Sequence, residues 1–193
     1  MPKVWTPFPT IFGSQEHSDW DFKDKLVLTD MIRLNYFNLK GNQRIFEIII
    51  DNANKYSIDL STRDSHGETA FHHACENDNF EIAEIIILKS IEKNINLNAK
   101  DGNEMTAFHY ACMKGNSRIV DIIIDNAELY HIDLTAKDRK GRNGAKIAEY
   151  YKRDNVVNLI REKMPGLLID SMHQRLRIYL SWNPWLKAIE SVS

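Results

Sequence analysis

The chain repeats itself every 37 residues, and this repeat constrains the fold more than any other feature of the sequence. The run TAFHHAC at residues 69–75 returns as TAFHYAC at residues 106–112, and isoleucine triplets begin at residues 48, 85 and 122. Repeats of this period are typical of solenoids, in which each unit is too small to bury its own core and packs against its neighbours. The sequence therefore predicts a stack of similar small units.

The repeated run resembles the ankyrin repeat, which carries the pattern Thr-Pro-Leu-His-x-Ala. Ala70 and Ala107 replace the proline of this pattern, and Phe71 and Phe108 replace the leucine. The resemblance implies an all-α fold, an ankyrin-repeat solenoid of helix pairs joined by β-hairpin-like loops. The array is expected in about four units, at residues 27–63, 64–100, 101–137 and 138–163.

The units are longer than usual, and the extra residues predict longer helices. A usual ankyrin unit has about 33 residues, so each unit here carries about four more, close to one helical turn. The extra residues follow the isoleucine triplets, at residues 51–56, 88–93 and 125–130. We therefore expect the second helix of each of the first three units to be one turn longer. The apolar spacing places Ile86 and Ile123 in the interior between units.

Each hairpin is predicted to open on an aspartate. Gly67 and Gly141 follow three residues later and supply a positive φ for the turn. The middle unit has Glu104 at this position, so its turn is expected to shift by one residue. The aspartates are Asp64, Asp101 and Asp138. The helix N-caps that follow are predicted at Thr69 and Thr106.

Two pairs of side chains have the spacing of metal ligands on a helix. His72 and Cys75 are three residues apart, as are His109 and Cys112. Repetition at the repeat period favours structure, and the resemblance implies histidines that bond the hairpin backbone and cysteines that pack as small apolar groups. A Cys–His nucleophile also needs an accessible thiol. Since the sequence has no phosphate loop, dinucleotide-binding turn or HExxH motif, we expect no metal, no cofactor, no catalytic residues and no enzyme activity.

Composition excludes several other classes of function. A net charge of −2 argues against a nucleic-acid interface, which needs a basic stripe. No apolar run is long enough to span a membrane, and the N-terminus has no signal peptide pattern. The two cysteines lie on helices expected about 8–10 Å apart, too far for a disulfide, and unpaired thiols suit the cytoplasm or the nucleus. The protein is expected to be monomeric on its own.

The resemblance implies a concave groove for a partner protein, formed by the hairpin tips and the exposed side of the first helices. The last unit gathers three cations beside two tyrosines, and Arg and Tyr are favoured interface anchors, so the partner is expected to carry an acidic segment. The alternatives are that these residues are only solvated, or that the groove binds through Met105 and Met113. The predicted partner-binding residues are Ser65, His66, Glu68, Asn103, Met105, Met113, Lys114, Arg139, Lys140, Arg142, Tyr150 and Tyr151. The matching helix positions in earlier units are Leu39, Lys40, Glu76 and Asn77.

The two ends of the chain flank the array. Residues 1–26 are rich in Trp and Phe, and are expected to cap the first unit; the alternative is a flexible lure for a partner. Residues 164–193 are expected to cap the last unit, and they faintly resemble a truncated F-box. Two classes of function fit these features. The first is a non-catalytic adaptor or scaffold. The alternative to it is a dedicated inhibitor, similar to short viral NF-κB inhibitor-like ankyrin proteins, or else a ubiquitin-ligase adaptor that uses the C-terminal segment.

One asparagine stands where some ankyrin repeats are hydroxylated. Asn98 holds this place, and Ser61 and Thr135 hold it in the neighbouring units. The resemblance therefore suggests Asn98 as a site of hydroxylation, but a turn-forming asparagine is the preferred interpretation. We expect Asn98 to be unmodified.

Overall fold

The computed structural model describes residues 42–53 and 60–168. In this part of the chain there are seven α-helices, one short 3-10 helix and no strand, so the predicted all-α class is confirmed. The helices are α2 (Asn42–Asp51), α3 (Ala70–Glu76), α4 (Phe80–Lys93), α5 (Ala107–Lys114), α6 (Ser117–Asn126), α7 (Gly144–Tyr150), α8 (Asp154–Lys163) and the 3-10 helix η2 (Pro165–Leu167).

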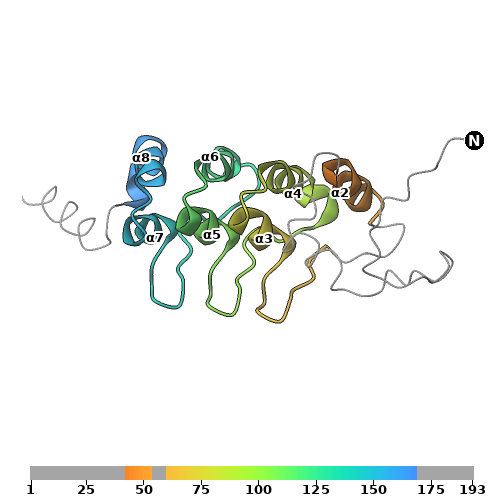
Figure 1. The fold of residues 1–193 in the computed structure, drawn as a ribbon, viewed down its shortest axis with the longest axis horizontal. Coiled ribbons are helices and arrows are strands. Elements are labelled where there is room, and N and C mark those ends of the chain that lie inside the picture. Colours follow the sequence, from red (N-terminus) through yellow and green to blue (C-terminus); the bar gives the residue numbers. More distant parts are fainter. Residues whose placement is uncertain (1–41, 54–59, 169–193) are drawn as a thin grey trace, which may run out of the picture.

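The helices form two rows along an elongated molecule (Figure 1). One row contains α3, α5 and α7, and the other contains α2, α4, α6 and α8. Each helix packs against its neighbours in the row, α3 against α5, α5 against α7, α4 against α6 and α6 against α8. The loops that precede α3, α5 and α7 project to the same side. Three helix pairs therefore stack side by side, as the 37-residue repeat predicts.

Several predicted features lie outside the described residues. These are the cap at residues 1–26, the positions Leu39 and Lys40, and residues 169–193 of the C-terminal segment. At the start of that segment, η2 packs against α8 and Leu167 is buried. The Leu167 carbonyl oxygen accepts a hydrogen bond from Asn143 Nδ2 at 2.9 Å. The first residues of this segment therefore contact the fourth unit.

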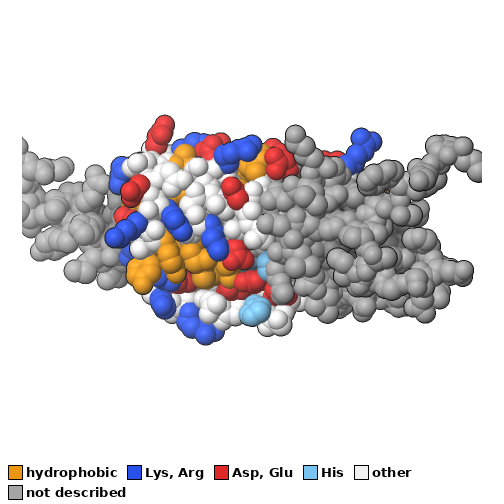
Figure 2. Space-filling model, in the orientation of Figure 1, with side chains coloured by type: hydrophobic (Ala, Val, Ile, Leu, Met, Phe, Trp, Pro, Cys, Tyr) orange, Lys and Arg blue, Asp and Glu red, His pale blue; other side chains and the backbone are white. Residues whose placement is uncertain are grey.

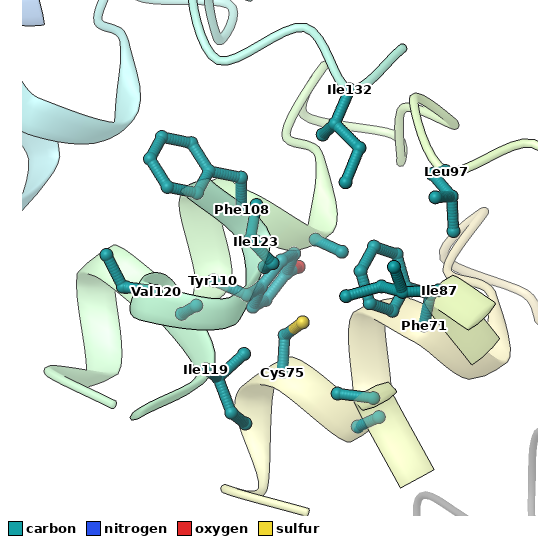
Figure 3. Close-up of a cluster of buried hydrophobic side chains, with 14 of the residues drawn as sticks. Phe71, Cys75, Ile87, Leu97, Phe108, Tyr110, Ile119, Val120, Ile123 and Ile132 are labelled. Carbon is teal, nitrogen blue, oxygen red and sulfur yellow. The ribbon is translucent and has the colours of Figure 1, made fainter. Parts of the chain in front are cut away.

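The core lies between the two rows and continues from unit to unit. Ile86 of α4 is 2% exposed and Ile123 of α6 is 0% exposed, so the prediction that both lie in the interior is confirmed. Figure 3 shows side chains from α3, α5 and α6 converging there, among them Phe71, Phe108 and Ile123. Each unit supplies only part of this core, which is why the units need one another.

The second helix is extended in one unit only. α4 has 14 residues and includes the whole of residues 88–93, as predicted. α6 ends at Asn126 and residues 127–130 form turns, while α2 ends at Asp51 and turns follow, so the prediction of a longer helix is wrong for both. The reason is local: α4 continues with strong helix formers, whereas α6 ends in Asp-Asn. Asn126 Nδ2 donates to the Ile122 carbonyl at 2.8 Å, a side-chain bond that competes with the helix.

The three hairpin loops share one conformation. In each loop, Oδ1 of the opening aspartate accepts two backbone N–H bonds, at 2.7–2.9 Å. The residue three positions later has a positive φ in every loop, +82° at Gly67, +61° at Glu104 and +73° at Gly141. The expected shift of the middle turn is therefore wrong. Glu104 adopts the left-handed conformation instead, because the aspartate cap fixes the register of the loop.

The helix caps confirm the structural role of the two histidines. The N–H of Thr69 donates to His72 Nδ1 at 3.0 Å, so Nδ1 is an acceptor and Nε2 carries the proton. That Nε2 donates to the Met105 carbonyl of the next hairpin at 3.1 Å. His109 repeats the arrangement with the N–H of Thr106, and its Nε2 lies 3.2 Å from the Arg142 carbonyl. Burial lowers the pKa of His72 to about 4 and also lowers the pKa of His109.

The two cysteines behave as core residues. Cys75 and Cys112 are free and buried, as predicted. Burial raises the pKa of both thiols, and in Cys75 the neighbouring Cys112 adds to this. A buried thiol of high pKa is a poor nucleophile. Because both ring nitrogens of His72 are engaged in hydrogen bonds, the His72–Cys75 pair is part of the scaffold.

Candidate interaction surface

The hairpin tips and the ends of the first helices form one face of the array. Figure 2 shows hydrophobic side chains gathered over α7 and α5, with Lys and Arg side chains on the hairpin tips beside them and Asp and Glu side chains toward α3. The predicted residues that are exposed are Ser65, His66, Asn103, Lys114, Arg139, Lys140, Tyr150 and Tyr151. Glu68, Met113 and Arg142 are half-buried, and Met105 is buried.

Two exposed tyrosines lie side by side at the end of α7 in the fourth unit. Tyr150 is 68% exposed and Tyr151 is 42% exposed. Their ring centroids lie 5.1 Å apart in an edge-to-face arrangement. The Arg142 guanidinium lies 5.2 Å from the Tyr150 ring centroid, within the range of a cation–π contact. The tyrosine pair, Tyr150 and Tyr151, is therefore held in place by contacts within its own unit.

The three predicted tip cations are held in different ways. Arg142 donates from Nε and Nη2 to Asp138 Oδ2, at 2.9 and 2.7 Å, so its charge is paired. Arg139 donates a side-chain hydrogen bond to the Gly102 carbonyl of the preceding hairpin and keeps its charge. Lys140 is exposed and forms no ion pair with any described residue. The basic tip therefore consists of Arg139 and Lys140, with Arg142 neutralised behind it.

The third unit places one partly exposed apolar side chain, Met113, in the middle of the face. Met113 is half-buried against the core, and Lys114 Nζ lies 3.1 Å from Glu76 Oε1 of the second unit. Met105 is only 9% exposed and its carbonyl accepts the hydrogen bond from His72. The Met105 side chain therefore offers little surface to a partner, and Met113 is the methionine that reaches the face.

The second unit carries a network of carboxylates that was not predicted from the sequence. His73 Nε2 lies 3.1 Å from Asp64 Oδ2 and 3.4 Å from Glu68 Oε2. The Tyr110 hydroxyl lies 2.5 Å from Glu68 Oε1 and 2.9 Å from Asp101 Oδ2. This carboxylate network, formed by Asp64, Glu68, His73, Asp101 and Tyr110, joins the second unit to the third. Its signal in the sequence is that His73 and Tyr110 each follow a hairpin aspartate by nine residues.

The hydrogen bonds and burial within the network shift the pKa values of Asp64 and Tyr110. Burial acts to raise the pKa of Asp64, but the N–H donors of Glu68 and His66 outweigh it and leave the pKa below its usual value. Burial and the two neighbouring carboxylates raise the pKa of the Tyr110 hydroxyl. Ligand atoms of Asp64, Glu68 and His73 lie within 4.8 Å of one another, a separation that would allow a metal ion. In this structure His73 Nε2 itself contacts the carboxylates of both Asp64 and Glu68.

Charge is distributed unevenly along the array. Residues 61–97 carry three Lys or Arg and seven Asp or Glu, a net charge of −4 with neutral histidines. Residues 135–168 carry nine Lys or Arg and four Asp or Glu, a net charge of +5. The net charge of −2 for the whole chain conceals this polarity. The two ends of the array therefore differ in net charge.

Asn98 has a structural role in the connection between units. Its Nδ2 donates to the His131 carbonyl at 2.7 Å, and its Oδ1 accepts from the N–H of Asp133 at 2.8 Å. Both ends of the amide are therefore bonded to the backbone of the next unit.

Comparison with known proteins agrees with the repeat seen in the fold. The family model described as "Ankyrin repeats (many copies)" matches residues 86–124, and the model described as "Ankyrin repeat" matches residues 66–99. None of the curated proteins compared with the chain matches it. Among the described helices, none is both long and apolar enough to cross a membrane. Ankyrin repeats form protein–protein interaction modules, and this coarse function follows for the matched part of the chain.

Proposed function

Since the chain is an ankyrin-repeat protein, we propose that it is a non-catalytic adaptor or scaffold whose fourth unit holds an acidic segment of a partner protein. One observation carries the proposal. The exposed tyrosine pair and the basic tip lie in the same unit, and residues 135–168 around them carry a net charge of +5. The contact residues are expected to be Arg139, Lys140, Tyr150 and Tyr151, with Met113 at the edge.

The tyrosine pair supplies the area that a partner buries. Tyrosine combines a large, rigid ring with a polar hydroxyl, and it is enriched among residues that dominate binding energy. Tyr150 and Tyr151 already lie in a fixed edge-to-face geometry, so little side-chain freedom is lost on docking. Two exposed aromatic rings in one place support an interface better than single solvated loop residues do.

The basic tip favours a partner segment that is acidic. Exposed charges mainly raise the rate of encounter with a partner of opposite charge, and salt screens them. Lys140 has no ion pair among the described residues, so its charge is available to a partner. The buried free thiols support a reducing compartment, the cytoplasm or the nucleus, as the place of this function. An adaptor and an inhibitor would share this surface, and they differ in whether the partner's activity falls on binding.

The test is a charge reversal that leaves the Arg142–Asp138 pair intact. Partners would be recovered by proximity labelling, and binding kinetics measured for the variant Arg139→Glu, Lys140→Glu. The matched control is Arg44→Glu, Arg161→Glu, which makes the same change of charge on exposed residues of α2 and α8. We expect the tip variant to lower the association rate about tenfold at low ionic strength, and the control to have little effect. Equal rates for the two variants would refute the proposal.

The tyrosine pair is tested separately. Tyr150→Ala, Tyr151→Ala should raise the dissociation rate, because the ring area is lost from the bound state. Melting curves of both variants establish that they are folded. If the double alanine variant bound as tightly as the parent, the fourth unit would not be the binding surface.

A further inference from the structure

The charge of the face that the proposed function uses changes from negative beside α3 to positive in the fourth unit, and we infer from this the charge pattern of its partner. We propose that the bound segment is a charge dipole: its acidic residues meet the basic tip of the fourth unit, and a basic residue meets Glu68 and Glu76 beside α3. Between them, an apolar residue lies over Met113. This inference rests on the proposed function, and it adds the second contact and the order of the three groups.

The first observation is a row of equivalent positions on the first helices. Glu76, Met113 and Tyr150 are separated by 37 residues, so they occupy the same place on α3, α5 and α7. Their side chains change from acidic to apolar to aromatic along the array. Glu76 and Met113 are half-buried and Tyr150 is exposed, and the Glu76 carboxylate lies 3.1 Å from Lys114 Nζ in an ion pair that is itself partly exposed. A segment that crosses the three helices therefore meets these chemistries in a fixed order.

The second observation is the negative charge beneath the surface of the second unit. The carboxylate network brings Asp64, Glu68 and Asp101 together around His73 and Tyr110, and none of the three forms an ion pair with a described Lys or Arg. Glu68 is the member that reaches the surface, with a side chain 15% exposed, while that of Asp64 is 2% exposed. Carboxylates set in a low-dielectric wall project their field outward. This end of the face therefore favours a cation.

The third observation is that the fourth unit presents cations where the second unit presents carboxylates. Glu68 corresponds to Met105 and Arg142 at the 37-residue spacing. In the fourth unit the aspartate of the hairpin is paired with Arg142, and the exposed cations Arg139 and Lys140 stand at the tip. Figure 2 shows the same change, with acidic side chains toward α3 and basic side chains on the tips beside α7. A uniformly acidic segment would be repelled at one end of the face, which is why the charge of the partner should also change sign.

The size of the units sets the spacing of the groups in the partner. Neighbouring helices pack about 8–10 Å apart, so α3 and α7, with α5 between them, are separated by about 16–20 Å. An extended chain advances about 3.3 Å per residue. The acidic and basic residues of an extended segment should therefore be about five or six residues apart.

The test uses a displayed library of random peptides of about 16 residues, long enough to cross the three units in extended form. The full chain is the bait. Enriched peptides are expected to carry acidic and basic residues about five or six positions apart, with an apolar residue between them. Their affinity is then measured for Glu68→Gln, Glu76→Gln, in which the glutamine at 68 still accepts the Tyr110 hydroxyl. The matched control is Glu81→Gln, Glu84→Gln, which removes the same charge from α4.

We expect the Glu68→Gln, Glu76→Gln variant to weaken binding of the dipolar peptides about three- to tenfold, and the control variant to leave it unchanged. Enrichment of peptides that are acidic throughout would overturn the dipole while leaving the proposed function in place. A library without binders would overturn both. A second copy of the chain is the other occupant of a dipolar face, since an antiparallel pair would match opposite ends. Light scattering that shows a dimer dissociated by salt would overturn the assignment to a partner segment.

Discussion

Truncation of one isoleucine of α4 separates the contribution of the core from that of the helix. Ile86 is 2% exposed, whereas Ile91, on the same helix, is 66% exposed. Ile→Ala removes three carbon groups, each worth about 0.8 kcal/mol when it is fully buried, which gives about 2.4 kcal/mol at position 86. The cavity that remains adds to this, so the expected loss of unfolding free energy is about 2–5 kcal/mol.

The exposed position provides the matched control. At Ile91 only about a third of the transfer free energy is at stake, about 0.8 kcal/mol, and the better helix propensity of alanine returns about 0.4 kcal/mol. Ile91→Ala should therefore change the unfolding free energy by no more than about 0.5 kcal/mol. The two variants differ only in the environment of the deleted atoms.

Urea unfolding followed by circular dichroism measures both variants against the parent. A repeat array unfolds through interactions between neighbours, so the denaturant slope must be equal in the three proteins before free energies are compared. With equal slopes, Ile86→Ala should lower the midpoint strongly and Ile91→Ala should not. A difference of less than about 1 kcal/mol between the two variants would refute the placement of Ile86 in the core between units.

Three further predictions concern the hairpins and their caps. Glu104 has a φ of +61°, which costs a residue with a side chain about 1–2 kcal/mol, so Glu104→Gly should stabilise the array by about 0.5–1 kcal/mol after the entropy of glycine, measured by urea unfolding. The pKa of His72 is about 4 in the folded protein, below its usual 6.5. Its contribution to stability is therefore complete above pH 6.5 and is lost as the pH falls toward 4. The unfolding free energy of the parent should fall more steeply over this range than that of His72→Gln. Asn98 should be unmodified in mass spectra of the protein from its native cells, and a hydroxylated residue would contradict the structural interpretation.

The sequence was sufficient for the scaffold because the scaffold repeats. The 37-residue period predicted the helix pairs, the buried Ile86 and Ile123, the structural histidines and the free cysteines. Each of these depends on a residue that recurs at the same place, so the neighbouring units test the assignment. The sequence failed where a single local interaction decided the result. Asn126 ends α6 through its own side-chain bond, and Glu104 accepts a positive φ because the aspartate cap holds the loop in register.

The proposed interaction face depends instead on positions where the repeat changes its residue, and this is why its chemistry needed the structure. The sequence counted three cations in the last hairpin, but Asp138 neutralises Arg142 and leaves the basic tip with two. It placed Met105 on the groove, but the loop that bonds His72 turns that side chain into the core. It passed over His73 and Tyr110, because a histidine and a tyrosine at one repeat position show no common chemistry until the carboxylates around them are in view. In each case the partner of the side chain, rather than its identity, decides what charge or surface it offers to another protein. The change of charge along the face survives this correction at Glu68, which forms no ion pair with a described Lys or Arg, whereas Glu76 is paired with Lys114 at 3.1 Å.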